Sequence, residues 1–219
     1  MNKQKFWWGL GLLAAFILWT AAVSFWDVQP VGPNGSCVGF ATVNVWFHSL
    51  TGCNRNLYVL TDWLGLVPVA VGFGFAALGL CQWIRRRDIR KVDADLWLLG
   101  GFYIVTLGAY LLFEEVVINY RPVLIEGFLE ASYPSSTTLL VLCVMPTAAV
   151  QLKSRIQKPL LRKLVLTAIW AFAGFMVVGR LLSGVHWLTD IIGGLLLSTS
   201  LVMLYCAKIG SCLKKYSQN

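Results

Sequence analysis

Six long apolar stretches constrain what this chain can fold into. They cover residues 6–26, 57–84, 96–113, 138–152, 164–182 and 187–207. Apolar runs of roughly 20 residues cross a bilayer as helices. The fourth run is short, but the uncharged residues 135–138 extend it. Of the 219 residues, 58% are hydrophobic and 13% charged, whereas soluble domains carry about a quarter charged residues. We therefore expect an all-α integral membrane protein, a bundle of six transmembrane helices.

The chain carries no sign of a second unit. No repeat or soluble appendage interrupts the pattern, so we expect a single membrane-embedded domain over residues 1–219. The first apolar stretch is too long and too rich in tryptophan for a cleaved signal peptide, and we expect it to remain as a helix.

The basic residues predict the orientation. All but Arg55, Arg121 and Arg180 of the 18 lysines and arginines lie at alternate ends of the predicted helices. The basic residues at these alternate ends are Lys3, Lys5, Arg85, Arg86, Arg87, Arg90, Lys91, Lys153, Arg155, Lys158, Arg162, Lys163, Lys208, Lys214 and Lys215. By the positive-inside rule these residues and both termini are cytoplasmic. The net charge of +8 then reflects topology and attraction to anionic lipid, so we expect no nucleic-acid partner.

The three outer connections differ in character. In residues 27–56, the segment VGFATVNVWFHSLTG predicts a short amphipathic helix at the membrane interface. Residues 114–133 also look partly helical, with a break at Pro122. The third connection is very short. Cys37 and Cys53 lie in the first of these loops, where a disulfide is permitted, although sequence cannot supply its geometry.

The stretch GRLLSGVHWLTD holds a charged cluster of Arg180, His186 and Asp190 beside an apolar run. In a helix, His186 and Asp190 would share one face, where a carboxylate can hold an imidazole. Ionisable groups in such positions are costly and indicate a functional site. The alternative is a structural ion cluster that joins two helix ends.

Two further outer segments complete a set suited to phosphate. Arg121 lies in NYRP, and Ser135 and Ser136 lie in YPSS. Arginine offers a planar fork of donors to phosphate oxygens, and a helix start such as the one expected after Pro134 favours an anion. We expect Arg121, Arg180, Ser135 and Ser136 to bind phosphate. Helix capping alone also accounts for the serines, and an interfacial arginine can reach the headgroups.

In chain order the outer segments read E-x6-RP from Glu114, PSST from Pro134 and GR-x5-H-x3-D from Gly179. This set, over about 114–190, resembles the signature K-x6-RP, PSGH and SR-x5-H-x3-D of the type 2 phosphatidic acid phosphatase and haloperoxidase superfamily. The resemblance implies that His186 is the nucleophile that takes the phosphoryl group and that Asp190 orients its ring. It implies no metal and no cofactor.

The chain departs from the family pattern at three positions. Glu114 replaces the lysine, Gly179 replaces the serine before the arginine, and Thr137 replaces the histidine that acts as general acid. A threonine hydroxyl cannot protonate a leaving group near neutral pH. Three residues could supply the proton instead, namely His48 and the carboxyl groups Glu114 and Glu115, if apolar surroundings raise the pKa of a carboxyl group. Asp62 could pair with Arg55 or reach the site.

We expect a metal-independent membrane lipid phosphatase in a plasma membrane, with the site facing outside. The compact chain is typical of a bacterial protein. Its substrate would be a lipid phosphate or diphosphate. A polyprenyl diphosphate is favoured, because its leaving phosphate needs acid catalysis less than an alkoxide does. The alternatives are a catalytically silent relative that binds or translocates lipid phosphates, and a phosphotransferase that uses an acceptor other than water. The sequence leaves open a homo-oligomer.

Overall fold

A computed structural model describes residues 1–216, with side chains through residue 210. The α-helices are α1 (Lys3–Phe25), α2 (Ala41–Thr51), α3 (Arg55–Leu64), α4 (Leu66–Arg86), α5 (Ala94–Glu115), α6 (Ser136–Arg155), α7 (Pro159–Leu182) and α8 (Leu188–Tyr216), and two 3₁₀ helices, η1 (Pro33–Gly35) and η2 (Ile89–Lys91), lie in connections. Isolated β-bridges are the only strand pairing among the described residues.

The six predicted membrane spans are confirmed, and the chain is a multi-pass membrane protein. Each expected stretch coincides, to within one residue at either end, with part or all of a helix or helix pair long and apolar enough to cross a bilayer. The second span, Arg55–Arg86, consists of α3 and α4. The helix breaks at Gly65 because Pro68 has no N–H for the carbonyl of Leu64 and its ring crowds that carbonyl.

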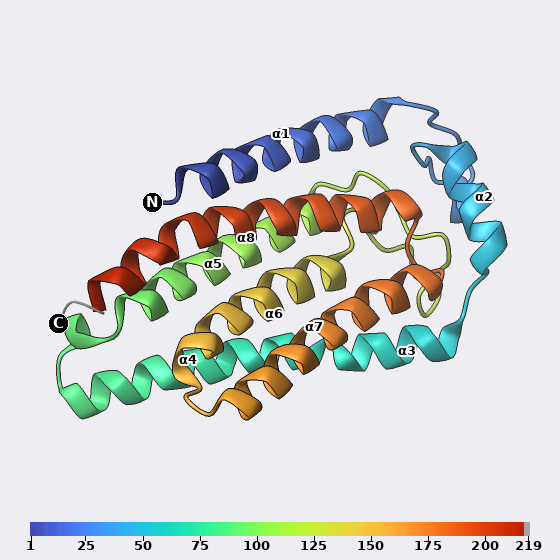
Figure 1. The fold of residues 1–219 in the computed structure, drawn as a ribbon. Coiled ribbons are helices and arrows are strands. Elements are labelled where there is room, and N and C mark those ends of the chain that lie inside the picture. Colours follow the sequence, from blue (N-terminus) through green and yellow to red (C-terminus); the bar gives the residue numbers. More distant parts are fainter. Residues whose placement is uncertain (217–219) are drawn as a thin grey trace.

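The helices run side by side, and the start of α1 and the end of α8 lie at one end of the bundle (Figure 1). The amide of Asn2 donates to the carbonyl of Ala207, which ties the start of α1 to α8. The α4–α5 and α6–α7 connections, which carry most of the predicted basic residues, lie at this end (Figure 1). The side chains of Lys214 and Lys215 fall outside the described residues. The opposite end carries α2 and the loops that join α5 to α6 and α7 to α8 (Figure 1).

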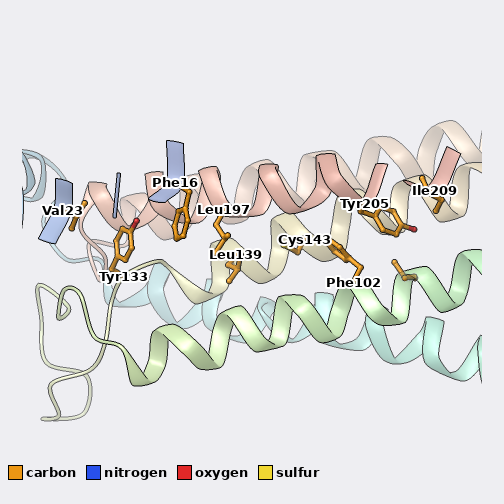
Figure 2. Close-up of a cluster of buried hydrophobic side chains, with 10 residues drawn as sticks. Phe16, Val23, Phe102, Tyr133, Leu139, Cys143, Leu197, Tyr205 and Ile209 are labelled. Atoms are coloured by element: carbon orange, nitrogen blue, oxygen red, sulfur yellow. The ribbon is translucent and has the colours of Figure 1, made fainter. Parts of the chain in front are cut away.

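The main core lies where α1, α5, α6 and α8 meet. Aromatic and aliphatic side chains from these helices interdigitate along the bundle (Figure 2). Tyr133, from the loop just before α6, is 1% exposed and stacks on Phe16 with ring centroids 6.3 Å apart. Its hydroxyl is 2.7 Å from the hydroxyl of Thr20. The core therefore anchors one end of the loop that leads into α6.

The predicted amphipathic helix in the first outer loop is present as α2. Asp27 accepts a hydrogen bond from the amide of Thr42 at the start of this helix. The apolar side chains Val43, Trp46 and Leu50 on α2 are exposed, in keeping with a helix at the membrane interface. Cys37 and Cys53 are both free and exposed, so the permitted disulfide is not formed in this structure.

The prediction that residues 114–133 are partly helical beyond the end of α5 is wrong. After Glu115 the chain forms an irregular hairpin with isolated bridges at Tyr120 and Ala131 and at Ile125 and Phe128. Its turn contains Gly127 with φ +87°, a backbone conformation that suits glycine and ends a helix. The hairpin brings the start of this loop back beside its end, next to the α7–α8 connection.

Candidate active site

The Arg180–His186 segment lies at the junction of α7 and α8. Arg180 is on the last turn of α7, and His186 is in the connection that precedes Leu188. Gly184 has φ +68°, and a Cβ there would lie 1.8 Å from the carbonyl oxygen of Gly52. The amide of Asn54 donates to the carbonyl of Ser183 at 2.9 Å. The segment before α3 thus holds the connection that carries His186.

His186 is buried, and both ring nitrogens have partners. Its Nδ1 lies 3.0 Å from Oγ of Ser132 and 3.2 Å from the carbonyl oxygen of the same residue. Its Nε2 lies 3.0 Å from Nη2 of Arg180. Because a guanidinium can only donate, Nε2 accepts and the proton of the neutral ring is on Nδ1. The lone pair of Nε2 therefore faces the guanidinium of Arg180.

Asp190 is fully buried behind His186, but the helical stacking expected from the spacing is wrong. His186 precedes α8, and the carboxylate of Asp190 lies 3.9 Å from Nδ1. Its Oδ2 instead accepts from the amide of Trp187 at 2.8 Å and from Oγ of Ser132 at 2.5 Å. The amide of Asn119 donates to Oδ1 at 3.4 Å. Asp190 thus caps the start of α8 and reaches His186 through Ser132.

Ser132 and Asn119 were not predicted from the sequence. Both are buried polar residues close to recognised segments, three residues before Ser135 and two before Arg121. Polarity beside a motif was the only signal available, and it does not separate these residues from other loop residues. Their contacts with Asp190 depend on how the hairpin folds back onto α8.

Arg180 is 1% exposed and is held by α3. Its Nη1 lies 3.6 Å from Oδ1 of Asp62, and its guanidinium carbon lies 5.2 Å from the ring centroid of Tyr58. Asp62 therefore reaches the site. Within the described part of the chain, Nε and Nη1 of Arg180 are buried and have no hydrogen-bond partner. These N–H groups are available to an anion.

Arg121 comes from the hairpin. Its backbone amide donates to the carbonyl of Glu130, and its Nε lies 3.2 Å from the carboxylate of Glu130. That contact lacks hydrogen-bond geometry, and Nε and Nη1 have no hydrogen-bond partner among the described residues.

Burial, followed by the positive charges of Arg180 and Arg121, lowers the pKa of His186 well below its ordinary value. The two arginines therefore act on the same imidazole, which stays neutral.

Ser135 and Ser136 begin α6 as expected. Ser135 is the N-cap, and its Oγ accepts from the amide of Thr138. Its own amide donates to the carbonyl of Asp190 at 3.1 Å, which joins the start of α6 to α8. Ser136 and Thr137 line a large apolar cavity between α4, α5 and α6. The serine segment therefore contacts both the histidine site and this cavity.

A sequence model of the PAP2 superfamily matches residues 69–210, more than half of the chain. The chain belongs to the PAP2 superfamily. Among solved structures, it is similar to a transmembrane PAP2-type phosphatidylglycerolphosphate phosphatase from Bacillus subtilis, with a TM-score of 0.53 and 18% sequence identity over 93% of this chain and 95% of the other. No curated protein matches. The match to the superfamily begins after α3, so His48, Tyr58 and Asp62 lie outside it.

The residues that could replace the PAP2 general acid lie in three different settings. His48, on α2, has its Nε2 3.1 Å from the carbonyl oxygen of Gly184, and its ring centroid is 5.6 Å from that of Trp187. Glu114 lines a cavity of about 10 Å³ together with Ser132, room for about one water molecule. Glu115 is exposed at the end of α5. All three lie on the same end of the bundle as His186.

Proposed function

We propose that this protein is a membrane lipid phosphatase that uses His186 as its nucleophile. The observation that carries the proposal is the contact between Nε2 of His186 and the buried guanidinium of Arg180, 3.0 Å apart. A phosphoryl group bound to the N–H groups of Arg180 would meet the lone pair of Nε2. Superfamily membership favours a lipid phosphatase in general, and the likeness to a transmembrane PAP2 protein supports the fold.

The charges suit transfer of a phosphoryl group. Arg121 and Arg180 supply buried N–H donors without hydrogen-bond partners among the described residues. Donors fixed in advance around developing negative charge are usually the largest contribution to catalysis. The start of α6 at Ser135 and Ser136 would add backbone N–H groups and the positive end of a helix dipole.

An apolar cavity of about 630 Å³ supports a lipid as the substrate. It lies between α4, α5 and α6 and is lined by Pro68, Gly72, Phe73, Tyr103, Leu107 and Thr137, among others. Thr137 is at the start of α6, close to the phosphate-binding segment, and the other residues extend along the bundle. A lipid chain in this cavity would leave its phosphate at the polar end.

The reaction would proceed in two steps. Nε2 of His186 forms a bond to phosphorus while the bond from phosphorus to the lipid oxygen breaks, and the lipid leaves with that electron pair. Water then attacks the phosphohistidine, breaks the P–N bond and releases inorganic phosphate, which restores the imidazole. Arg121 and Arg180 would hold the phosphoryl oxygens in both steps, and Asp190 would stabilise the charge that the ring gains.

Replacement of the family's acid by Thr137 favours a polyprenyl diphosphate as substrate. The leaving group is then a lipid monophosphate, for which the usual acid contribution of roughly 10²–10⁴ matters less. With a monophosphate ester the leaving alkoxide would need a proton from His48, Glu114 or Glu115. If turnover survives in each of the variants His48→Ala, Glu114→Gln and Glu115→Gln, none of these residues is the donor.

The positive-inside rule supports an extracytoplasmic site. The α7–α8 connection, which carries His186, and the α5–α6 loop lie at one end of the bundle, and the start of α1 and the end of α8 lie at the other (Figure 1). The basic residues that follow α4 and precede α7 belong to the end with the termini. Their excess would retain that end in the cytoplasm, so the site would act on lipids of the outer leaflet of a plasma membrane.

A catalytically silent protein that binds or translocates lipid phosphates is the second candidate. The observation that favours it is the loss of both the family's lysine, at Glu114, and its general acid, at Thr137. A third reading is a phosphotransferase that passes the group from His186 to an acceptor other than water. An oriented imidazole contributes little to simple binding, and this favours the enzyme.

Phosphate release from purified protein tests the proposal. The wild type and His186→Ala are assayed in detergent with a polyprenyl diphosphate and with phosphatidic acid, with chelator and without added metal. We expect release by the wild type alone, with an acid-labile phosphoenzyme that the variant does not form. Lipid binding without release would support the silent protein, and release only with an added acceptor would support the phosphotransferase.

A further inference from the structure

Ser132 occupies the space between the imidazole and the carboxylate of the site. Its Oγ lies 3.0 Å from Nδ1 of His186 and 2.5 Å from Oδ2 of Asp190, whereas Nδ1 and Oδ2 are 3.9 Å apart. The hydroxyl is therefore the contact through which the carboxylate reaches the ring. Ser132 lies outside the three segments that indicated the family.

The direction of these hydrogen bonds follows from their ends. Nε2 of His186 accepts from Arg180, so Nδ1 carries the proton and donates. An ionised carboxylate only accepts, so the Ser132 hydroxyl donates to Asp190. Its oxygen is then free to accept from Nδ1. A hydroxyl has one donor and can accept on the same oxygen, which fits this sequence of bonds from imidazole to hydroxyl to carboxylate.

The backbone holds Ser132 in this position from both sides. Its amide donates to the carbonyl of Asn119 at 2.9 Å, and the residue is only 2% exposed. The next residue, Tyr133, is buried between α1 and α8 (Figure 2). A Cβ at Gly193 would lie 2.6 Å from its ring, so α8 leaves little room for the ring to move. The hydroxyl is thus fixed relative to Asp190.

We propose that the Ser132 hydroxyl is a positioning residue that couples Asp190 to Nδ1 of His186. Together with the carbonyl oxygen of the same residue, 3.2 Å from Nδ1, it keeps the proton on Nδ1, so that the lone pair of Nε2 points toward Arg180. When Nε2 bonds to phosphorus the ring gains positive charge, and Nδ1–H donates more strongly to a hydroxyl polarised by the carboxylate. Hydrogen bonds that include an ionised partner are roughly twice as strong as neutral ones. The kinetic consequence rests on the proposed phosphatase function, whereas the tautomer does not.

The first test is spectroscopic and needs no substrate. The chain has only two histidines, so ¹⁵N-histidine NMR of the wild type and of His48→Ala assigns the ring of His186. We expect the Nδ1–H tautomer in the wild type. Ser132→Ala should shift the Nδ1–H resonance and speed its exchange with water, and Ser132→Thr should restore the wild-type signal. Ser198→Ala is the matched control, because Ser198 is fully buried and, among the described residues, its hydroxyl bonds only to the carbonyl of Leu195.

The second test asks whether Ser132 carries the effect of Asp190. Turnover is measured for Ser132→Ala, Asp190→Asn and the double variant, because residues that act through one contact show non-additive effects. We expect Ser132→Ala to lower kcat about 10- to 100-fold, the range for removal of a group behind a functional histidine in metal sites. In that background Asp190→Asn should add little.

The outcomes separate the two proposals. An Nε2–H tautomer in the wild type, or an Nδ1 signal unchanged by Ser132→Ala, overturns the role of Ser132. Fully additive losses in the double variant overturn it as well. The wild type could release no phosphate and still have an Nδ1–H signal that Ser132→Ala shifts. That result contradicts the proposed phosphatase function and supports the coupling. If Ser132→Ala fails to fold, the Nδ1–H signal of Asp190→Asn is compared with that of the wild type. A shifted signal supports the coupling, and an unchanged signal overturns it.

Discussion

The Cγ2 methyl of Thr61 lies 2.7 Å from the position that a Cβ at residue 179 would take. Gly179 precedes Arg180 on α7, where the family signature has serine. Thr61 is fully buried on α3 and bonds through its hydroxyl to the carbonyl of Leu57. The close approach of α3 and α7 therefore needs glycine at 179, and it places Tyr58 and Asp62 against the guanidinium of Arg180.

Restoring the family's serine should destabilise this protein. Gly179→Ser should lower the thermal unfolding midpoint, because overpacking costs about 1–3 kcal/mol and a helix gains only about 0.5 kcal/mol when serine replaces glycine. Thr61→Ser removes the clashing methyl and keeps the hydroxyl, so the double variant should recover most of the loss. Gly174→Ser is the control on the same helix, because a Cβ there meets nothing within 4 Å. An equal loss at 174 would contradict the explanation.

Arg180→Lys should reduce phosphate release by about 10²- to 10³-fold, the usual effect of removing one donor to a developing oxyanion. Lysine keeps the charge but lacks the planar fork that can donate to Nε2 of His186 and to phosphate together. Arg55→Lys is the matched control at the same end of the bundle, because Arg55 is exposed. Similar activity in both variants would mean that the guanidinium geometry is unimportant.

The membrane spans could be predicted because apolar length is a local property of the sequence. The short helix α2 was likewise visible in its apolar spacing. The hairpin at residues 116–135 was not predictable, because it depends on the bonds between Arg121 and Glu130 across the loop and on the left-handed conformation of Gly127. Residues 114–133 look partly helical only when these partners across the loop are unknown.

Part of the candidate site could likewise be predicted from the sequence, and part could not. Arg180, His186 and Asp190 lie within eleven consecutive positions, so their spacing alone indicated chemistry. Ser132 and Asp62 come from a loop and a helix far away in the sequence, and their contacts exist only in the folded bundle. The contact from Asp190 to His186 through a hydroxyl could not be read from the i, i+4 spacing, because the helix begins after His186.

Filling the apolar cavity should impair long-chain substrates selectively. Gly72 lines the cavity, and a Cβ there would lie 3.8 Å from the ring of Tyr103, so Gly72→Leu can be accommodated and projects into the space. Each displaced methylene costs about 0.8 kcal/mol, and two would raise KM about tenfold. Gly74→Leu is the control, since Gly74 is on the same helix outside the lining. An equal effect on a short-chain soluble phosphate would contradict a lipid-chain site.

The buried imidazole should make the fold sensitive to acid. The pKa of His186 lies well below the ordinary value of 6.5 because of burial, Arg180 and Arg121. Below pH 6.5 the unfolded chain binds a proton that the folded protein does not, so stability falls as pH falls. The drop in unfolding midpoint from pH 8 to pH 5 should be smaller in His186→Gln than in the wild type. A mutation that only removed packing would shift both midpoints equally.

Asp62 should compete with phosphate for Arg180. Its carboxylate lies 3.6 Å from Nη1, and its side chain is 59% exposed, so solvent limits the ion pair to about 0.2–1 kcal/mol. Asp62→Asn should therefore strengthen inhibition by inorganic phosphate by roughly 1.4- to 5-fold, and the gain should shrink in high salt. Asp27→Asn removes a carboxylate at the same end and should leave the inhibition constant unchanged. Weaker inhibition in Asp62→Asn would mean that the carboxylate holds Arg180 in its binding position.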